Sequence, residues 1–138
     1  MWSFGCILYE LHNGYPLFAG ENENEQLQCI MEVKGTPPYS VLAAASRRKT
    51  FFDKNYNPIL EPNSHNKVRK PGEKSLAELM NCEDESFVDF IDKCIEWKVE
   101  ERLTPETAQQ HPWIREGLKE IAKNNSKYAE NKKAKEAS

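Results

Sequence analysis

The chain has 138 residues, the length of one domain, and a formal net charge of −3 at pH 7. Hydrophobic residues make up 38% and charged residues 30%, so the chain can build a core, but only a modest one. This balance does not favour a nucleic-acid or membrane partner. Residues 47–74 carry eight Lys or Arg against three acids, and residues 83–106 carry nine acids against three Lys or Arg. We expect these stretches to form two solvated faces of opposite sign that attract each other.

The first eleven residues, MWSFGCILYEL, are apolar on nearly every face of a helix. Such a helix is normally buried on several sides, and this one is too short to span a bilayer, which needs about 20 residues. Gly14 offers a left-handed cap at its C-terminal end. No N-cap residue precedes the helix, so we expect Met1 to be an internal methionine.

Residues 21–34 predict a second helix, because Leu27, Ile30 and Met31 recur at helical spacing and acids occupy the first turn. A short helix over residues 41–45 is expected next, with a serine as its cap.

Residues 53–75 are polar and lack any periodicity, which predicts a long irregular connection. Residues 84–97 predict a third amphipathic helix with acids in its first turn. Thr104 followed by proline predicts the start of a short helix. Residues 115–123 can extend as a helix, whereas residues 124–138 lack core-forming residues and are expected to be disordered or a frayed helix.

The four cysteines contain no C-x-x-C pair, and the three histidines have no metal-ligand spacing to one another or to the cysteines. We therefore expect no metal site. Three of the cysteines lie within apolar helical patterns, which favours buried, reduced thiols in an intracellular protein, either cytoplasmic or nuclear.

Several segments resemble eukaryotic protein kinases. W-S-x-G-C-I-L-x-E-L, from Trp2 to Leu11, is similar to the central helix of the kinase C-terminal lobe. E-x-x-Q-L-x-x-I-x-x-x-x-G-T-P-P, residues 23–38, resembles the CMGC group of kinases. K-x-R-x-P-G-x-K-x-L, residues 67–76, resembles a signature of the dual-specificity tyrosine-regulated kinases, and W-x-x-x-x-R-L-T-P-x-x-A-x-x-H-P-W-I, residues 97–114, resembles the end of a kinase domain.

The resemblance covers residues 1–114 and has two departures. Lys98 and Val99 stand where the family usually has Asp-Pro, and Gln109 stands where Leu is common. These changes affect one turn and one packing contact without undoing the match.

The resemblance implies an all-α fold: the C-terminal part of the kinase large lobe over residues 1–114, with an irregular insertion at 53–75 and a Lys-rich tail at 115–138. In the full-length parent it implies phosphorylation of protein Ser/Thr with ATP and Mg²⁺, and tyrosine autophosphorylation during maturation. The 138 residues contain no G-x-G-x-x-G, H-R-D, D-F-G or A-P-E motif. We therefore expect this chain alone to be inactive and to hold no cofactor and no catalytic residue.

The resemblance also implies roles for individual residues. Trp2, Gly5, Arg102 and Trp113 are expected to be structural. Arg102 would form a buried ion pair with the Glu of A-P-E, a motif that this sequence lacks. In this chain we therefore expect Arg102 to turn to solvent or to pair with a local acid, so that its loss changes stability by under about 1 kcal/mol.

The second helix and the insertion are expected to face outward as a docking surface for protein substrates or regulators. The residues proposed for this surface are Leu27, Ile30, Met31, Lys67, Arg69 and Lys70. The N-terminal part of the kinase domain is a further expected partner.

Two alternatives remain open from the sequence. A non-catalytic helical module could bind partners through the basic insertion. Nucleic-acid binding by the same loop is not favoured, because the loop has no interleaved aromatic residues near 65–74.

Overall fold

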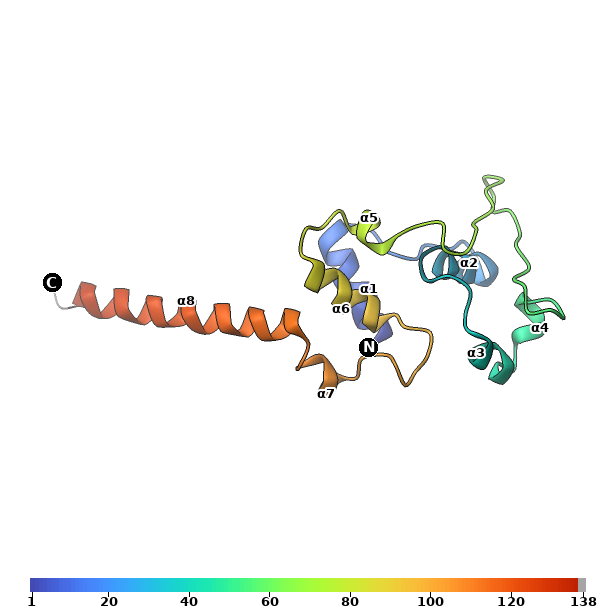
Figure 1. The fold of residues 1–138 in the computed structure, drawn as a ribbon. Helices are drawn as coiled ribbons and strands as arrows, with labels where there is room; N and C mark the ends of the chain where they lie inside the picture. Colours follow the sequence, from blue (N-terminus) through green and yellow to red (C-terminus); the bar gives the residue numbers. More distant parts are fainter. Residues whose placement is uncertain (137–138) are drawn as a thin grey trace. The chain divides into compact units, whose positions relative to one another are not determined.

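The computed structural model describes residues 1–136 of the 138. Within these residues every regular element is a helix (Figure 1). The helices are α1 (Trp2–Asn13), α2 (Glu23–Lys34), α3 (Tyr39–Ala44), α4 (Arg48–Phe51), α5 (Leu76–Met80), α6 (Glu85–Cys94), α7 (Pro105–Ala108) and α8 (Pro112–Glu136). The chain divides into two compact units, Met1–Leu103 and Thr104–Ser138, which are described separately.

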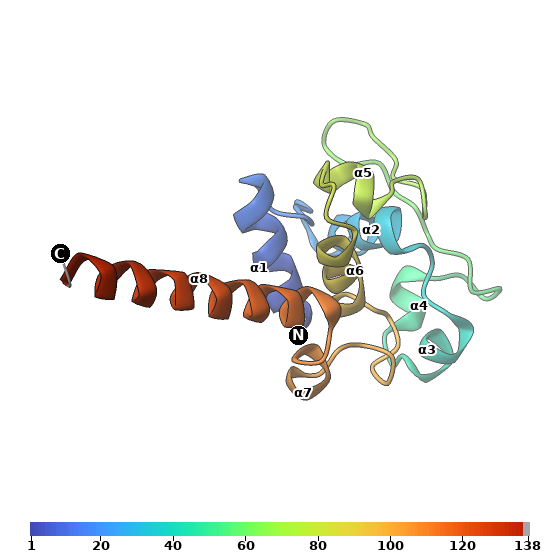
Figure 2. The ribbon, with the colours of Figure 1, turned by 60° about the vertical axis from the view of Figure 1, so that its left-hand side comes forward.

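Helix α1 begins and ends where the sequence predicts. Met1 supplies no side-chain cap, and Gly14 closes the helix in the left-handed conformation with φ 82°, its N–H donating to the carbonyl of Glu10. Helix α1 packs along α6 and touches α5, as the ribbon shows from two sides (Figures 1 and 2). These three helices form the main core, whose buried residues are Tyr9, Leu76, Met80, Ile91 and Ile95.

Helix α1 is apolar on nearly every face, a composition typical of a helix buried on several sides, but in the structure one of its faces is exposed. Phe4, Ile7 and Leu11 expose 44%, 53% and 77% of their surfaces, and only Gly5 and Tyr9 are buried. The few helices of the chain cannot cover all the apolar side chains of α1, whose main helix neighbours among the described residues are α6 and α5. We call Phe4, Ile7 and Leu11 the α1 stripe, since their spacing of i, i+3 and i+7 places them on one helix face.

Helix α2 is capped by Asn22, whose side chain accepts a hydrogen bond from the Glu25 N–H. It belongs to a second, smaller core with buried Met31, Leu42 and Phe52. Leu42 lies on α3 and Phe52 directly follows α4, so this core joins α2 to the two short helices.

The predicted irregular insertion is confirmed, since residues 53–75 contain no helix. Its end is tied to α2 by two backbone hydrogen bonds. The Gly72 N–H donates to the Met31 carbonyl at 2.9 Å, and the Lys74 N–H donates to the Glu32 carbonyl at 3.0 Å. Two carbonyls in the final turn of α2 thus bind the insertion, and that of Met31 also accepts the N–H of Gly35.

The second unit starts with α7, whose capping box joins Thr104 and Thr107. Helix α8 then runs for 25 residues to Glu136. For residues 124–138 the sequence left disorder or a frayed helix open, and the structure shows helix as far as Glu136, whereas residues 137–138 lie outside the described residues. Ala, Lys and Glu have high helix propensity, which favours a helix even without a core.

Candidate docking surface

Gly5 sets the distance between α1 and α6. A Cβ atom at this position would lie 2.6 Å from the Cβ of Cys94, closer than atoms can approach. Burial raises the pKa of the Cys94 thiol to about 11, as expected for a packed, apolar contact. The predicted structural role of Gly5 therefore rests on close helix packing.

Trp2 and Arg102 lie together at the start of α1. The Trp2 ring lies 5.9 Å from the ring of Trp97, and the Arg102 guanidinium lies 5.1 Å from the Trp2 ring centroid. Arg102 Nε donates to the Glu96 carbonyl at 2.9 Å. The sequence predicts that Arg102 turns to solvent or pairs with a local acid, and the structure shows neither. A backbone carbonyl and an aromatic face are within its reach instead.

These contacts change the expected effect of Arg102→Ala. We expect it to lower the free energy of unfolding by about 1.5–3 kcal/mol, since it removes a charged hydrogen bond and a cation–π contact. Urea unfolding followed by tryptophan fluorescence measures the change. Arg102→Lys, which keeps the charge but not the planar fork, should recover only part of the loss. A loss below about 0.5 kcal/mol for Arg102→Ala would contradict this role.

Trp113 belongs to the second unit, in the first turn of α8. Its side chain is half-buried, and its backbone N–H donates to Nδ1 of the buried His111 at 3.3 Å. Trp113, Ile114, Gly117, Leu118 and Ile121 line an open hollow of about 250 Å³ on α8.

The predicted apolar docking residues of α2 separate into two groups. Met31 is 1% exposed and belongs to the second core, so its assignment to an outward surface is wrong. Leu27 is half-buried and packs against the same core. Ile30 is half-buried. Helical spacing alone could not separate these faces, because α2 is flanked on two sides.

The insertion is bound to α2 by a cluster of ion pairs. Arg69 is its centre, with Nε 3.2 Å from Glu25 Oε1 and Nη1 2.9 Å from Glu32 Oε2. Lys74 Nζ lies 3.1 Å from Glu32 Oε2, and Lys67 Nζ lies 3.7 Å from Glu32 Oε1. The side chains of Glu25 and Glu32 are only 6% and 3% exposed. We call these five residues the α2–insertion cluster.

Hydrogen bonding keeps both buried carboxylates ionised. The pKa of Glu25 is lowered first by the backbone N–H of Glu21, then by the Asn63 amide and by Arg69. Burial alone would raise the pKa of Glu32, but hydrogen bonds from Lys74 and Arg69 outweigh it and lower that pKa. The side chains of Lys67, Arg69 and Lys74 thus compensate the negative charges of the two buried carboxylates.

The cluster corrects the expected docking surface. The Arg69 side chain is only 18% exposed and forms ion pairs with Glu25 and Glu32, so it does not face outward. Lys67 and Lys74 also pair with Glu32, whereas Lys70 is exposed and lies outside the α2–insertion cluster. Much of the basic stretch is therefore a structural clamp instead of a free solvated face.

Sequence reasoning missed Glu25 and Glu32, the two acids that receive the insertion. Their spacing of seven residues places them on one face of α2, which is the available signal. Reading that signal requires knowing that the insertion folds back onto α2, and a loop without periodicity does not reveal this.

An open groove also adjoins this surface. It measures about 690 Å³ and lies between the end of α2 and helices α5 and α6. Val33, Leu76 and Val88 form apolar lining, and Glu83, Glu85 and Asp89 supply acidic side chains. In the sequence, only the acidic run of residues 83–85 is a signal of this groove.

Residues 1–136 contain neither a candidate membrane-spanning helix nor a candidate metal site. No helix among them is long and apolar enough to cross a membrane. No group of three His, Cys, Asp or Glu in the same part of the chain is arranged to hold a metal ion.

The comparisons with known proteins agree with this fold. Residues 1–114 match the protein kinase domain family. The chain is 50% identical over 114 residues to dual specificity tyrosine-phosphorylation-regulated kinase 2 of Drosophila melanogaster, covering 83% of this chain and 16% of the relative. The human kinase 4 of that name is also 50% identical over 114 residues, with 83% and 22% covered. The DYRK-family kinase pom1 of Schizosaccharomyces pombe is 42% identical over 132 residues, with 96% and 12% covered.

The chain thus spans about an eighth to a fifth of the length of these relatives. The helical fold and the family match together confirm the predicted all-α part of the kinase C-terminal lobe. The chain belongs to the protein kinase family and, within it, to the dual-specificity tyrosine-phosphorylation-regulated kinases of the CMGC group.

Proposed function

We propose that this chain serves as the helical base of an ATP-dependent protein kinase that phosphorylates Ser/Thr and autophosphorylates on tyrosine. The family match over residues 1–114 carries the proposal. ATP and Mg²⁺ would be held by the glycine-rich and D-F-G motifs, and the H-R-D aspartate would accept the substrate's proton; none of these motifs occurs in these 138 residues. By itself the chain would position other elements and transfer no phosphate.

The exposed α1 stripe is evidence that a partner covers this face of α1 in the complete kinase. Phe4, Ile7 and Leu11 form a continuous apolar face, and such faces mark interaction sites. The proposed occupant is the N-terminal part of a kinase domain of the same family. Covering each side chain fully would contribute about 1.5–3 kcal/mol.

Fragment complementation tests this proposal. The isolated chain is expected to bind a hydrophobic dye, because the stripe is bare. Coexpression with the kinase-domain part that precedes the aligned segment in the human relative should give a stable complex that binds little dye. Copurification and dye fluorescence measure the two effects.

A charged variant of the stripe serves as the matched control. Leu11→Asp, at the most exposed stripe position, should leave the isolated chain as stable as before but abolish copurification. Lys70→Asp, at an exposed position away from the stripe, should not. Equal copurification of the Leu11→Asp variant would count against the stripe as the interface.

We place the docking of substrates or regulators on the outward remainder of α2 and the insertion, with Ile30 and Lys70 as accessible residues. The alternative, a non-catalytic module that binds through the basic insertion, is weakened by the α2–insertion cluster, which neutralises three of its basic side chains. A pulldown with and without residues 53–75 separates the two, because only the module predicts partners specific to the isolated chain.

A further inference from the structure

One motif of the chain is not used by the proposed function. Arg47, Arg48 and Lys49 directly precede Thr50, and the aromatic Phe51 follows it. Charged patterns around a hydroxyl are a means by which protein kinases select substrates. The motif places two arginines three and two residues before the hydroxyl.

We propose that Thr50 is a phosphorylation site for an arginine-directed Ser/Thr kinase, and that the phosphate draws Arg47 away from Glu23 and so breaks the ion pair between the starts of α4 and α2. In this reaction Thr50 Oγ1 attacks the γ-phosphorus of ATP bound to the modifying kinase. The bond from that phosphorus to the β,γ-bridging oxygen breaks, ADP leaves, and a carboxylate of the modifying kinase accepts the hydroxyl proton.

Thr50 is accessible to a modifying enzyme. Thr50 is exposed, and residues 43–47, which precede it, are also exposed. Helix α4 is only four residues long and has no side-chain cap at its start. Its backbone bonds include that from the Thr50 N–H to the Arg47 carbonyl at 3.0 Å, and the buried Phe52 anchors the end that follows it. Short elements with exposed hydrogen bonds open locally at low free energy.

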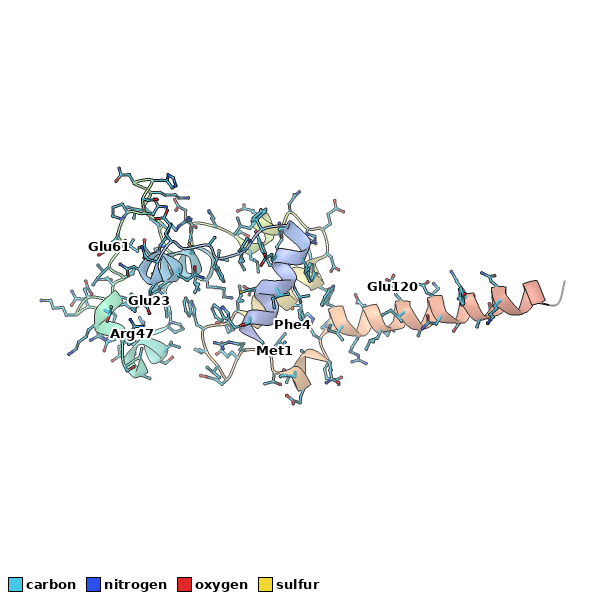
Figure 3. All side chains as sticks on the ribbon, turned by 180° about the vertical axis from the view of Figure 1, so that it is seen from behind. Met1, Phe4, Glu23, Arg47, Glu61 and Glu120 are labelled. Carbon is cyan, nitrogen blue, oxygen red and sulfur yellow. The ribbon has the colours of Figure 1, made fainter. Side chains whose placement is uncertain are left out.

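Arg47 is the residue that connects this segment to α2. Its guanidinium binds both carboxylate oxygens of Glu23, with Nη2 2.9 Å from Oε2. The two side chains approach each other from the starts of α4 and α2, as Figure 3 shows. Both are more than half exposed, at 61% and 63%. Exposed pairs of this kind contribute little stability and are easily exchanged.

A phosphate on Thr50 would compete well for Arg47. Residues three apart in a helical turn are neighbours, and the hydrogen bond from Thr50 N–H to Arg47 carbonyl shows such a turn here. A phosphate carries a charge of about −1.5 to −2 and three acceptor oxygens, against the single charge of Glu23. Arg48 is not the competing residue, because it already binds the Asp53 carbonyl and lies over the Tyr56 ring.

The first test maps the site. The 138-residue chain is incubated with ATP and the catalytic domain of an arginine-directed kinase, and phosphopeptides are identified by mass spectrometry. Thr50 should be the main site, and Thr50→Val should remove it. The matched control Thr36→Val changes another exposed threonine that lacks preceding arginines, and it should have no effect. Arg47→Gln should lower kcat/KM on the order of tenfold. Phosphorylation mainly elsewhere, or none, overturns the proposal.

The second test reads the link itself. The side-chain Nε–H resonance of Arg47, assigned with Arg47→Lys, should shift in Glu23→Gln when Thr50 is unmodified. After phosphorylation the resonance should move and become insensitive to Glu23→Gln, because Arg47 has changed partner. A phosphorylated chain in which Glu23→Gln still shifts the Arg47 resonance retains the ion pair, and this overturns the proposed exchange of partner.

Discussion

Gly5→Val is expected to lower the free energy of unfolding by about 3 kcal/mol, the upper end of the usual range for overpacking. The first added atom would lie 2.6 Å from the Cβ of Cys94, an atom fixed to the backbone of α6. Helices α1 and α6 must then separate, which loosens the main core around Tyr9 and Ile91. Urea unfolding followed by the fluorescence of Trp2 and Trp97 measures the effect.

Gly117→Val is the matched control, since it makes the same change in another helix. A Cβ at Gly117 meets no atom within 4 Å. Valine also has a higher helix propensity than glycine, so α8 should keep or gain helicity. Equal losses for the two variants would mean that the Gly5 effect is not caused by the contact with α6.

Arg69→Ala is expected to destabilise the chain by about 3–5 kcal/mol, because it leaves Glu25 and Glu32 buried and partly uncompensated. The same denaturant experiment measures this loss. Lys70→Ala, one residue away and exposed, should change stability by less than about 0.5 kcal/mol. A small effect for Arg69→Ala would show that the insertion is not clamped to α2.

The pH dependence gives this prediction a second readout. The pKa values of Glu25 and Glu32 are lowered in the folded chain, so their contribution is present above the unfolded value of about 4.3 and is lost as pH falls through the folded values. Without Arg69 the stranded carboxylates can protonate instead. The stability gap between the parent chain and Arg69→Ala should therefore narrow below about pH 4.

Local sequence signals predict most of the helices. Gly14, Asp84 and Thr104 cap helices as their residue types predict, since a cap depends on neighbours within one turn. Helices α4 and α5 were not predicted, because four or five residues are too few to display a period.

Long-range features could not be predicted in the same way. The burial of Met31 and the pairing of Arg69 with Glu25 depend on how residues 53–75 return to α2. The contact of Arg102 with Trp2 joins residues 100 positions apart. Sequence identifies these residues as apolar or charged, but their partners follow from the fold.

The central claim is that residues 1–114 form the helical base of a catalytic kinase lobe. The most direct test exchanges the aligned 114-residue segment of the human relative for residues 1–114 of this chain and measures phosphorylation of a protein substrate. We expect activity within about tenfold of the parent kinase, a difference of about 1.4 kcal/mol, and its loss with Gly5→Val. A folded, monomeric chimera without activity would mean that residues 1–114 do not form this base.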